Sequence, residues 1–340
     1  MGFHHDSSIR VYRPRRREPR IVCIGGGHGL SAMLRGLKRY TRSLTAIVTV
    51  ADDGGGSGML RRDLDMPPPG DIRSCILALA NTEPLMEKLF DYRFPEGALA
   101  GQSFGNLFLA AMYGVSDRFD EAVHRVSDVL AITGRVLPVT NQNVRLEAEF
   151  ENGERILGES RIAYQKKELD CRIRQVRLVP EHAKALDESV EAIRNADLII
   201  MGPGSLYTSI IPNFLVDGIA EAVAASRACR VLVLNIMTQE GETEGYTGPD
   251  HVRAILSHGG GHIIDVCVAN SSPVPPALLD AYLAEDAGPV DLRQTEIEAM
   301  GIQVRTYPLL AQGTVARHNP DALARALLDT YECWTPASAD

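Results

Sequence analysis

The 340-residue sequence has few of the features that assign a protein to a class at first sight. It contains one tryptophan, and its six cysteines are scattered without a CxxC pair, so they give neither a disulfide framework nor a zinc-ligand pattern. We expect these thiols to be reduced and buried. No apolar run reaches the roughly 20 residues that span a bilayer, and the amino-terminal segment lacks the apolar stretch of a signal peptide. We therefore expect a cytoplasmic protein with no membrane span.

Signatures of common catalytic sites are also missing. The sequence has no G-x-S-x-G elbow, no P-loop lysine pattern and no Cys/His pair in a useful context. Its His28, His251 and His262 lie on different segments without metal-ligand spacing. Because no activated nucleophile is visible, we predict no catalytic residue and favour a non-catalytic regulator over an enzyme.

Positive charge is scarce outside the amino terminus. The net charge is −9, although residues 1–20 hold six arginines against two acidic residues. The rest of the chain is therefore more acidic than the total suggests, which argues against nucleic acid as a partner. Residues 1–19 are expected to form a disordered basic leader, with contact to an anionic surface as the alternative.

Strand-like and helix-like segments alternate along most of the chain. The apolar runs RIVCI, LTAIVTV, ADLIIM, RVLVLNIM and HIIDVCVAN are each followed by glycines or prolines and then by a helical pattern. This rhythm predicts a three-layer, Rossmann-like α/β domain over residues 20–330, with a mostly parallel sheet and helices on both faces. Residues 331–340 are expected to form a carboxyl-terminal tail.

A different pattern interrupts this rhythm at about residues 134–180. Apolar residues alternate at Leu146, Ala148 and Phe150, and Asn152-Gly153 follows as a turn signal before a second short run. We predict a small antiparallel β-hairpin lobe inserted between two α/β halves.

The stretch IVCIGGGHGLSAMLRGLKRY runs from a strand through glycines into a helix expected to begin near Gly29 or Leu30. It departs from the dinucleotide fingerprint, because its glycines read G-x-G-x-G. Glycines still let backbone amides approach an anion at the positive end of a helix. A tight turn without ligand is the alternative. The nucleotide-binding residues that we predict here are Gly25, Gly26, Gly27, His28, Gly29 and Leu30.

An acidic pair, Asp52 and Asp53, ends the second strand-like run within ADDGGGSG. Adjacent strand residues point to opposite faces, so we expect the two carboxylates to divide the work. One would bind ribose hydroxyls or a metal ion, and the other would cap the glycine loop that follows.

Two further segments contain polar residues at expected helix starts. In PPPGDIRS, Asp71 is a good N-cap, and Arg73 is either a phosphate or carboxylate partner or an ion-pair partner of Asp71 or Asp52. In GQSFGNLF, Ser103 is expected to cap a helix, and Asn106 to reach a ligand.

A second glycine loop lies in LIIMGPGSLYTS. Because Pro203 has no N–H, we expect the amides of Gly204, Ser205 and Leu206 to be free to donate. Two such loops after strands suggest a crevice at a topological switch point. The later TQEGETE segment either binds sugar hydroxyls or is a solvated loop. The predicted binding residues of the second loop are Gly202, Gly204, Ser205, Leu206 and Tyr207.

These motifs resemble a known family. The resemblance is carried in chain order by IVCIGGGHGLSAMLRGLK, TAIVTVADDGGGSG, PPPGDIR, FGNL, GPGSLYTSIIPN and MTQEGETEGYTGPDHVRAI, and it extends to VARHNP. Together they look like the bacterial gluconeogenesis factors, relatives of the archaeal-type 2-phospho-L-lactate transferases of deazaflavin cofactor synthesis.

The resemblance implies a three-layer α/β fold that binds a nucleotide-sugar, usually UDP-N-acetylglucosamine. It also implies a role in cell shape and cell-wall precursor supply during gluconeogenic growth. A regulated enzyme of that supply and a homo-oligomer are the expected protein partners. By position, the glycines Gly25 to Gly29, the acidic pair and the loop Gly202 to Tyr207 would form the ligand site.

Two positions depart from the family pattern. Members usually read GGGTG and ADDGGSSG, whereas this chain has His28 and Gly56. His28 could replace the lost hydroxyl with an N–H, and its titration would then make binding depend on pH. A transferase with Mg²⁺ held near Asp52 or Asp53 is the main alternative. A nicotinamide-dependent oxidoreductase is a weaker one, because the fingerprint is broken.

Overall fold

A seven-stranded parallel sheet forms the centre of the protein, for which the computed structural model describes residues 18–81, 84–169 and 171–334. Every residue of its central strands is buried, which explains the nearly continuous apolar runs in the sequence. The strands are β1 (Ile21–Gly25), β2 (Leu44–Val48), β3 (Arg135–Pro138), β7 (Leu198–Met201), β8 (Cys229–Val233), β9 (Val266–Asn270) and β10 (Gln303–Tyr307).

The strand order is β10-β9-β8-β7-β1-β2-β3, and all neighbouring pairs are parallel. The chain begins in the middle at β1, builds outward to β3, and then returns to place β7 on the other side of β1. The direction of winding therefore reverses between β1 and β7, and such a switch point is where open α/β sheets form a crevice. This confirms the expected Rossmann-like class and the expected switch point.

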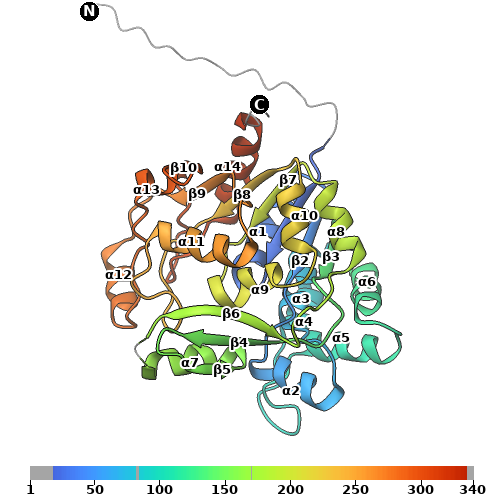
Figure 1. The fold of residues 1–340 in the computed structure, drawn as a ribbon. Helices are drawn as coiled ribbons and strands as arrows, with labels where there is room; N and C mark the ends of the chain where they lie inside the picture. The colour runs from blue at the N-terminus through green and yellow to red at the C-terminus, as the bar shows by residue number, and fades with distance from the viewer. Residues whose placement is uncertain (1–17, 82–83, 170, 335–340) are drawn as a thin grey trace, which may run out of the picture.

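Helices cover both faces of the sheet (Figure 1). The α1 helix (Gly27–Leu37) buries Leu30, Met33, Leu34 and Leu37, an apolar stripe with helical spacing. It packs with α3 (Gly70–Leu79) and α14 (Pro320–Cys333) on one face of the sheet. Because the chain winds in the opposite direction after β7, a second group of helices covers the other face. This second group is α8 (Asp187–Arg194), α9 (Ile211–Phe214), α10 (Ile219–Ala225) and α11 (Gly248–Gly259). The remaining helices outside the lobe are α2 (Gly55–Leu64), α4 (Pro84–Asp91), α5 (Phe104–Gly114), α6 (Phe119–Val129), α12 (Pro276–Leu283) and α13 (Gln294–Glu298).

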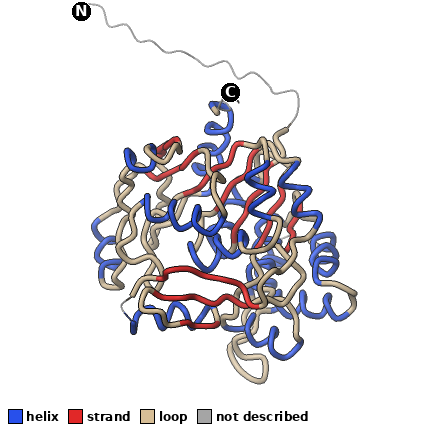
Figure 2. The backbone as a smooth tube through the Cα atoms, in the orientation of Figure 1, coloured by secondary structure: helices blue, strands red, loops and turns tan. Residues whose placement is uncertain are grey.

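The inserted lobe is a three-stranded antiparallel sheet in the order β5-β4-β6 with one helix, α7 (Glu159–Leu169). Its strands are β4 (Arg145–Phe150), β5 (Arg155–Leu157) and β6 (Ile173–Val179). The turn at Asn152-Gly153 joins β4 to β5 as expected. Figure 2 shows these strands running across the end of the large sheet. The expected start of the lobe at residue 134 is wrong, because β3 pairs with β2 in the large sheet.

The chain ends differ from expectation in one respect. The α14 helix continues to Cys333, so the expected tail from residue 331 begins too early. The expected leader falls almost entirely on residues 1–17, outside the described part of the chain. Four cysteines are buried as expected, whereas Cys171 and Cys333 are half-buried. In the described residues, no helix has the length and apolar character needed to cross a membrane.

Candidate functional site

The two glycine loops follow β1 and β7 and touch each other at the switch point. A Cβ atom on Gly29 would overlap the carbonyl oxygen of Pro203, and one on Gly204 would lie 3.3 Å from the carbonyl oxygen of Gly26. Glycine at position 29 is therefore required by the close approach of the second loop. The α1 helix begins at Gly27, two residues before the earlier of the expected starts.

A cleft of about 640 Å³ opens at this junction. Its walls come from segments that follow the carboxyl ends of β1, β2, β7, β8, β9 and β10, together with the lobe. The lining residues are Gly27, His28, Gly29, Ala32, Asp52, Asp71, Glu159, Pro203, Gly204, Ser205, Thr208, Ser209, Asn235, Ile236, Met237, Thr238, Gln239, Tyr282, Ala316, Arg317 and His318.

A second cavity, of about 520 Å³, lies at the opposite end of the sheet. It is bordered by the first residues of β1 and β2 and by Arg20, Arg42 and Arg135. Neither glycine loop borders this cavity. Ligands of doubly wound sheets bind at the carboxyl ends of the strands, so we place the candidate site in the first cleft.

Asp71 is a cleft residue that the sequence analysis treated only as a helix cap. The α3 helix begins at Gly70, so Asp71 lies in its first turn and is not its N-cap. The Asp71 carboxylate instead accepts the backbone amide of Gly27 at the start of α1. Burial and the nearby charge of Asp52 raise the pKa of Asp71 to about 7.

Asp52 and Asp53 do not have the separate roles expected, in which one carboxylate binds a ligand and the other caps the glycine loop. Asp52 lines the cleft, and its Oδ1 also accepts the amide of Gly54 at 2.8 Å, so the cleft residue is itself the loop cap. Asp53 turns to the lobe, where its Oδ1 accepts the amide of Ser160 at 2.8 Å in the first turn of α7. Asp53 therefore ties the lobe to the main sheet.

Glu159 brings a third carboxyl group to the same wall as Asp52 and Asp71. Burial, followed by the charges of Asp52 and Asp53, raises the pKa of Glu159 to about 8. Burial also raises the pKa of Asp52. Within the described residues, however, no three His, Cys, Asp or Glu side chains come close enough to hold a metal ion. We refer to Asp52, Asp71 and Glu159 as the acidic wall.

Basic and neutral groups also border the cleft. Arg317 and His318 come from the VARHNP segment, which the sequence analysis used for the resemblance but not for the site. Burial lowers the pKa of His318 to about 4, so this imidazole is neutral at physiological pH. Burial and Arg317 also lower the pKa of His28. The expected titration of His28 therefore moves away from neutral pH.

The second loop has fewer free amides than expected. Glu242 is buried, and its carboxylate accepts the backbone N–H groups of Leu206, Tyr207 and Thr208 at 2.9 to 3.2 Å. These amides open a single π-helical turn, η1 (Leu206–Ile210). Burial raises the pKa of Glu242 to about 7. The expectation that the Leu206 amide is free is therefore wrong.

The remaining groups of the second loop have divided roles. The Gly204 amide donates to Oδ1 of Asn235 at 3.3 Å, so it is not free either. Gly204 and Ser205 still line the cleft, with the Ser205 hydroxyl donating to Gln239 at 2.7 Å. The side chains of Leu206 and Tyr207 are buried, and neither these residues nor Gly202 line the cleft.

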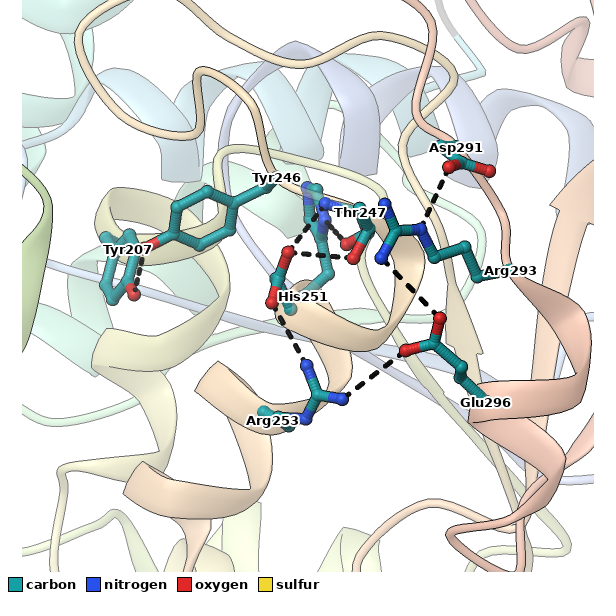
Figure 3. Close-up of polar contacts among 9 residues, drawn as sticks. Tyr207, Tyr246, Thr247, His251, Arg253, Asp291, Arg293 and Glu296 are labelled. Carbon is teal, nitrogen blue, oxygen red and sulfur yellow. Dashed lines mark hydrogen bonds and ion pairs between the residues drawn. The ribbon is translucent and has the colours of Figure 1, made fainter.

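A polar network surrounds Tyr246 and the start of α11, a few residues after Glu242 in the chain (Figure 3). The hydroxyls of Tyr207 and Tyr246 lie 2.9 Å apart. At the start of α11, Asp250 accepts both the amide and the hydroxyl of Thr247, at 2.9 and 2.7 Å. The network continues through ion pairs among Asp250, Arg253, Glu296, Arg293 and Asp291. The chain just after Glu242 is thus held by these contacts and is not a loose loop.

Several other predicted residues lie outside the cleft. Arg73 pairs with Asp91 at 2.7 Å, and not with Asp71 or Asp52. Ser103 caps α5 as expected, accepting the amide of Asn106 at 3.2 Å. The Asn106 side chain is buried, and its Oδ1 has no partner within the described part of the chain. From the first loop, Gly25, Gly26 and Leu30 support the turn but do not border the cleft.

The strand order, the two touching glycine loops and the cleft define a doubly wound α/β protein with a candidate ligand site at its switch point. Comparison with known proteins identifies the family. The sequence profile described as 2-phospho-L-lactate transferase CofD matches residues 21–310. The chain belongs to this family, in the group of the gluconeogenesis factors.

Individual relatives agree with this assignment. The Bacillus subtilis gluconeogenesis factor is 48% identical over 315 residues, covering 92% of this chain and 98% of the relative. A protein of Thermoanaerobacterium thermosulfurigenes is 51% identical over 315 residues, with coverages of 92% and 97%. A crystal structure from Bacillus halodurans superposes with a TM-score of 0.88 at 44% identity, covering 92% of this chain and 100% of the other.

Proposed function

We propose that this protein binds a nucleotide-sugar of the UDP-N-acetylglucosamine type in the cleft. The observation that carries the proposal is the contact between the two glycine loops at the switch point. Beyond Gly27, whose amide Asp71 accepts, the start of α1 would offer its remaining amides and its positive dipole end beside Arg317, which suits the diphosphate. Carboxylates accept hydrogen bonds from hydroxyl groups, so the acidic wall suits the sugars.

The biological role that we propose is regulatory. The protein would act in the cytoplasm, without turnover, on cell-wall precursor supply and cell shape during gluconeogenic growth. Its partner would be an enzyme of that supply, and the protein would work as a homo-oligomer. Support comes from the family membership and from the sequence, in which no activated nucleophile is visible.

A magnesium-dependent transferase is the second candidate, and the acidic wall is the observation that favours it. Mg²⁺ accepts oxygen ligands, often one or two carboxylates together with substrate phosphates. Asp52 and its neighbours offer such oxygens, whereas Asp53 is engaged by Ser160. Under this alternative, Asp52 would be the ligand and Mg²⁺ would supply charge neutralisation for the phosphates.

Calorimetry tests the proposal directly. The protein is titrated with UDP-N-acetylglucosamine and with UDP, each with and without Mg²⁺, and the nucleotide is then recovered and analysed. We expect saturable binding and an intact nucleotide-sugar. Released nucleotide would favour the transferase, and no heat at millimolar ligand would contradict both candidates.

A further inference from the structure

The α4 helix is anchored to the rest of the protein by one apolar residue. Of its eight residues, only Phe90 is buried. The ring of Phe90 packs edge-on against Phe104 and Phe108 of α5, with ring centroids 5.7 and 5.3 Å away. A helix this short is not stable in water by itself, so its stability depends on what its sides pack against.

The other apolar side chains of this segment face solvent. Leu85, Leu89 and Tyr92 are spaced i, i+4 and i+7, which puts them in one row, and Met86, three residues before Leu89, borders that row. The amide of Tyr92 donates to the carbonyl of Leu89 at 3.1 Å, so the helical turn continues to Tyr92. We refer to these four residues as the α4 patch. A surface helix ordinarily turns its apolar row toward the core, so this reversed row indicates a face that another molecule covers.

The size of the α4 patch fits a protein interface. Its exposed fractions are 76% for Leu85, 48% for Tyr92, 40% for Leu89 and 38% for Met86. These fractions leave roughly 400 Å² of mainly apolar surface, within the size range in which the largest patch of a single protein is often functional. One side of a standard interface buries about 800 Å², of which somewhat more than half is apolar. The patch therefore supplies most of the apolar area that one partner of a stable complex needs.

We propose that the α4 patch is the contact surface between two copies of this chain, with their α4 helices packed antiparallel about a two-fold axis near Leu89. This inference rests on the homo-oligomer of the proposed function and deepens it, because it assigns the surface. In a two-fold contact, the same residues meet reciprocally. An axis near Leu89 places Leu89 against Leu89, and Leu85 of each copy near Tyr92 of the other, so the row covers itself.

The charges around the patch support a second copy as the occupant. The chain has a net charge of −9, so two copies repel each other unless their contact surface is balanced. Lys88 and Asp91 are both exposed on α4, and the antiparallel arrangement brings Lys88 of each copy near Asp91 of the other. Asp91 is also held by Arg73 at 2.7 Å. Glu87 pairs with Arg35 at 3.7 Å, so the surface is not acidic enough to select a strongly basic partner.

Sedimentation velocity of the full chain at increasing concentration tests the proposal. We expect the wild type to dimerise. Leu89→Asp puts an unpaired carboxylate at the centre of the contact, so it should weaken dimerisation about thirtyfold or more. Val129→Asp is the matched control, because Val129 is 61% exposed on α6 and lies outside the patch. It should dimerise like the wild type, and circular dichroism should show that both variants are folded.

Leu85→Asp keeps the test valid if Leu89→Asp disturbs α4 itself. Leu85 is the most exposed residue of the patch, so its replacement scarcely affects the monomer, and it should weaken dimerisation as well. Wild-type dimerisation in either patch variant, or an equal loss in Val129→Asp, overturns this inference.

A wild type that stays monomeric at about 100 µM overturns the inference together with the proposed homo-oligomer, and a different protein would then be the occupant of the patch. Neither result bears on the nucleotide-sugar proposal, because no residue of the α4 patch lines the cleft. Failure of this inference is therefore distinguishable from failure of the ligand titration.

Discussion

The carboxylate of Glu242 holds the amide of Thr208 at 2.9 Å, and with it the start of η1. This relationship changes how the second glycine loop is understood. Its helix-start amides already donate to the Glu242 carboxyl group, so under the proposed function a ligand phosphate would use the first loop and Arg317. The second loop mainly shapes the cleft by lying against Gly29.

Glu242 is expected to make stability depend on pH. Its folded pKa of about 7 exceeds the ordinary value of about 4.3, so the folded state binds this proton more tightly than the unfolded state. Its contribution to stability is present below about pH 4 and is lost as pH rises to about 7. Glu242→Gln replaces the ionisable carboxyl group with an amide, so the variant does not lose this stability as pH rises. The melting temperature of the variant minus that of the wild type should therefore increase between pH 5 and pH 8. Differential scanning calorimetry measures it.

Glu240→Gln is the matched control for that experiment. Glu240 lies two residues away in the same segment but is half-exposed. Because Glu240 does not hold the amides of η1, Glu240→Gln should change the pH dependence of the melting temperature less than Glu242→Gln does. The prediction fails if the two variants differ from wild type in the same way at every pH.

The contact between the two loops is tested by Gly29→Ala. The added methyl group meets the backbone of Pro203, which cannot move away like the end of a flexible side chain. We expect a loss of about 1–3 kcal/mol in the free energy of unfolding, typical of overpacking. Nucleotide-sugar binding should weaken as well, because the loops separate.

Gly114→Ala provides the control for this glycine. Gly114 ends α5, and a Cβ atom there would meet no atom within 4 Å. Urea unfolding should give this variant the stability of the wild type or slightly more, because alanine favours helix. Equal behaviour of the two alanine variants would show that the loops are not tightly apposed.

Much of this fold could be predicted from sequence because buried parallel strands leave a direct signal. The runs at 21–25 and 198–201 are apolar throughout, and the glycines after them mark the loops. The edge strand β10 was missed because it has no fully buried residue. The apolar pattern of a strand reflects which of its residues are buried, and an edge strand buries too few residues to give a clear pattern.

The site was predicted less completely for a different reason. Tertiary packing brings Glu159 and Arg317 to the cleft and Glu242 to the amides of the second loop, and no local sequence pattern indicates which distant segment will lie there. Glu159 arrives on the inserted lobe, whose position depends on the bond from Ser160 to Asp53. Glu242 was part of a segment that fitted both a sugar site and a solvated loop, and it is neither.

The acidic wall is expected to make ligand binding depend on pH. With the pKa of Asp71 at about 7 and that of Glu159 at about 8, raising the pH from 6 to 9 adds negative charge to the cleft. A diphosphate is repelled by that charge, so its affinity should fall as pH rises. For each carboxyl group, the fall is at most about tenfold for every unit by which the bound ligand raises the pKa of that group. Mg²⁺ should flatten the profile by neutralising the charge. Calorimetry with UDP-N-acetylglucosamine at several pH values measures both effects.

Glu159→Gln should also flatten the profile, because its side chain stays neutral. Glu154→Gln is a suitable control, since Glu154 is exposed on the same lobe and does not line the cleft. An affinity that rises with pH in the wild type would contradict this account of the acidic wall.

The family departure at Gly56 leads to a prediction about stability. Gly56 is buried in α2, and a Cβ atom there would lie 2.9 Å from Oε1 of Gln102. That oxygen is buried and has no hydrogen-bond partner among the described residues. Gly56→Ser adds a hydroxyl donor beside it. The nearest neighbour is the end of the flexible Gln102 side chain, which can shift, and the backbone oxygen of Gly101 at 3.2 Å needs to move by only a few tenths of an ångström. We expect a gain of about 1 kcal/mol from the hydrogen bond and the better helix propensity together.

Gly56→Ala separates the two contributions, because alanine improves helix propensity at least as much but brings no donor. If Gln102 accepts the new hydroxyl, urea unfolding should place the serine variant above the alanine variant. If the alanine variant is as stable as the serine variant or more stable, the serine hydroxyl does not donate a hydrogen bond to Oε1 of Gln102. The usual family residue would then need a reason other than this hydrogen bond, such as contact with the ligand.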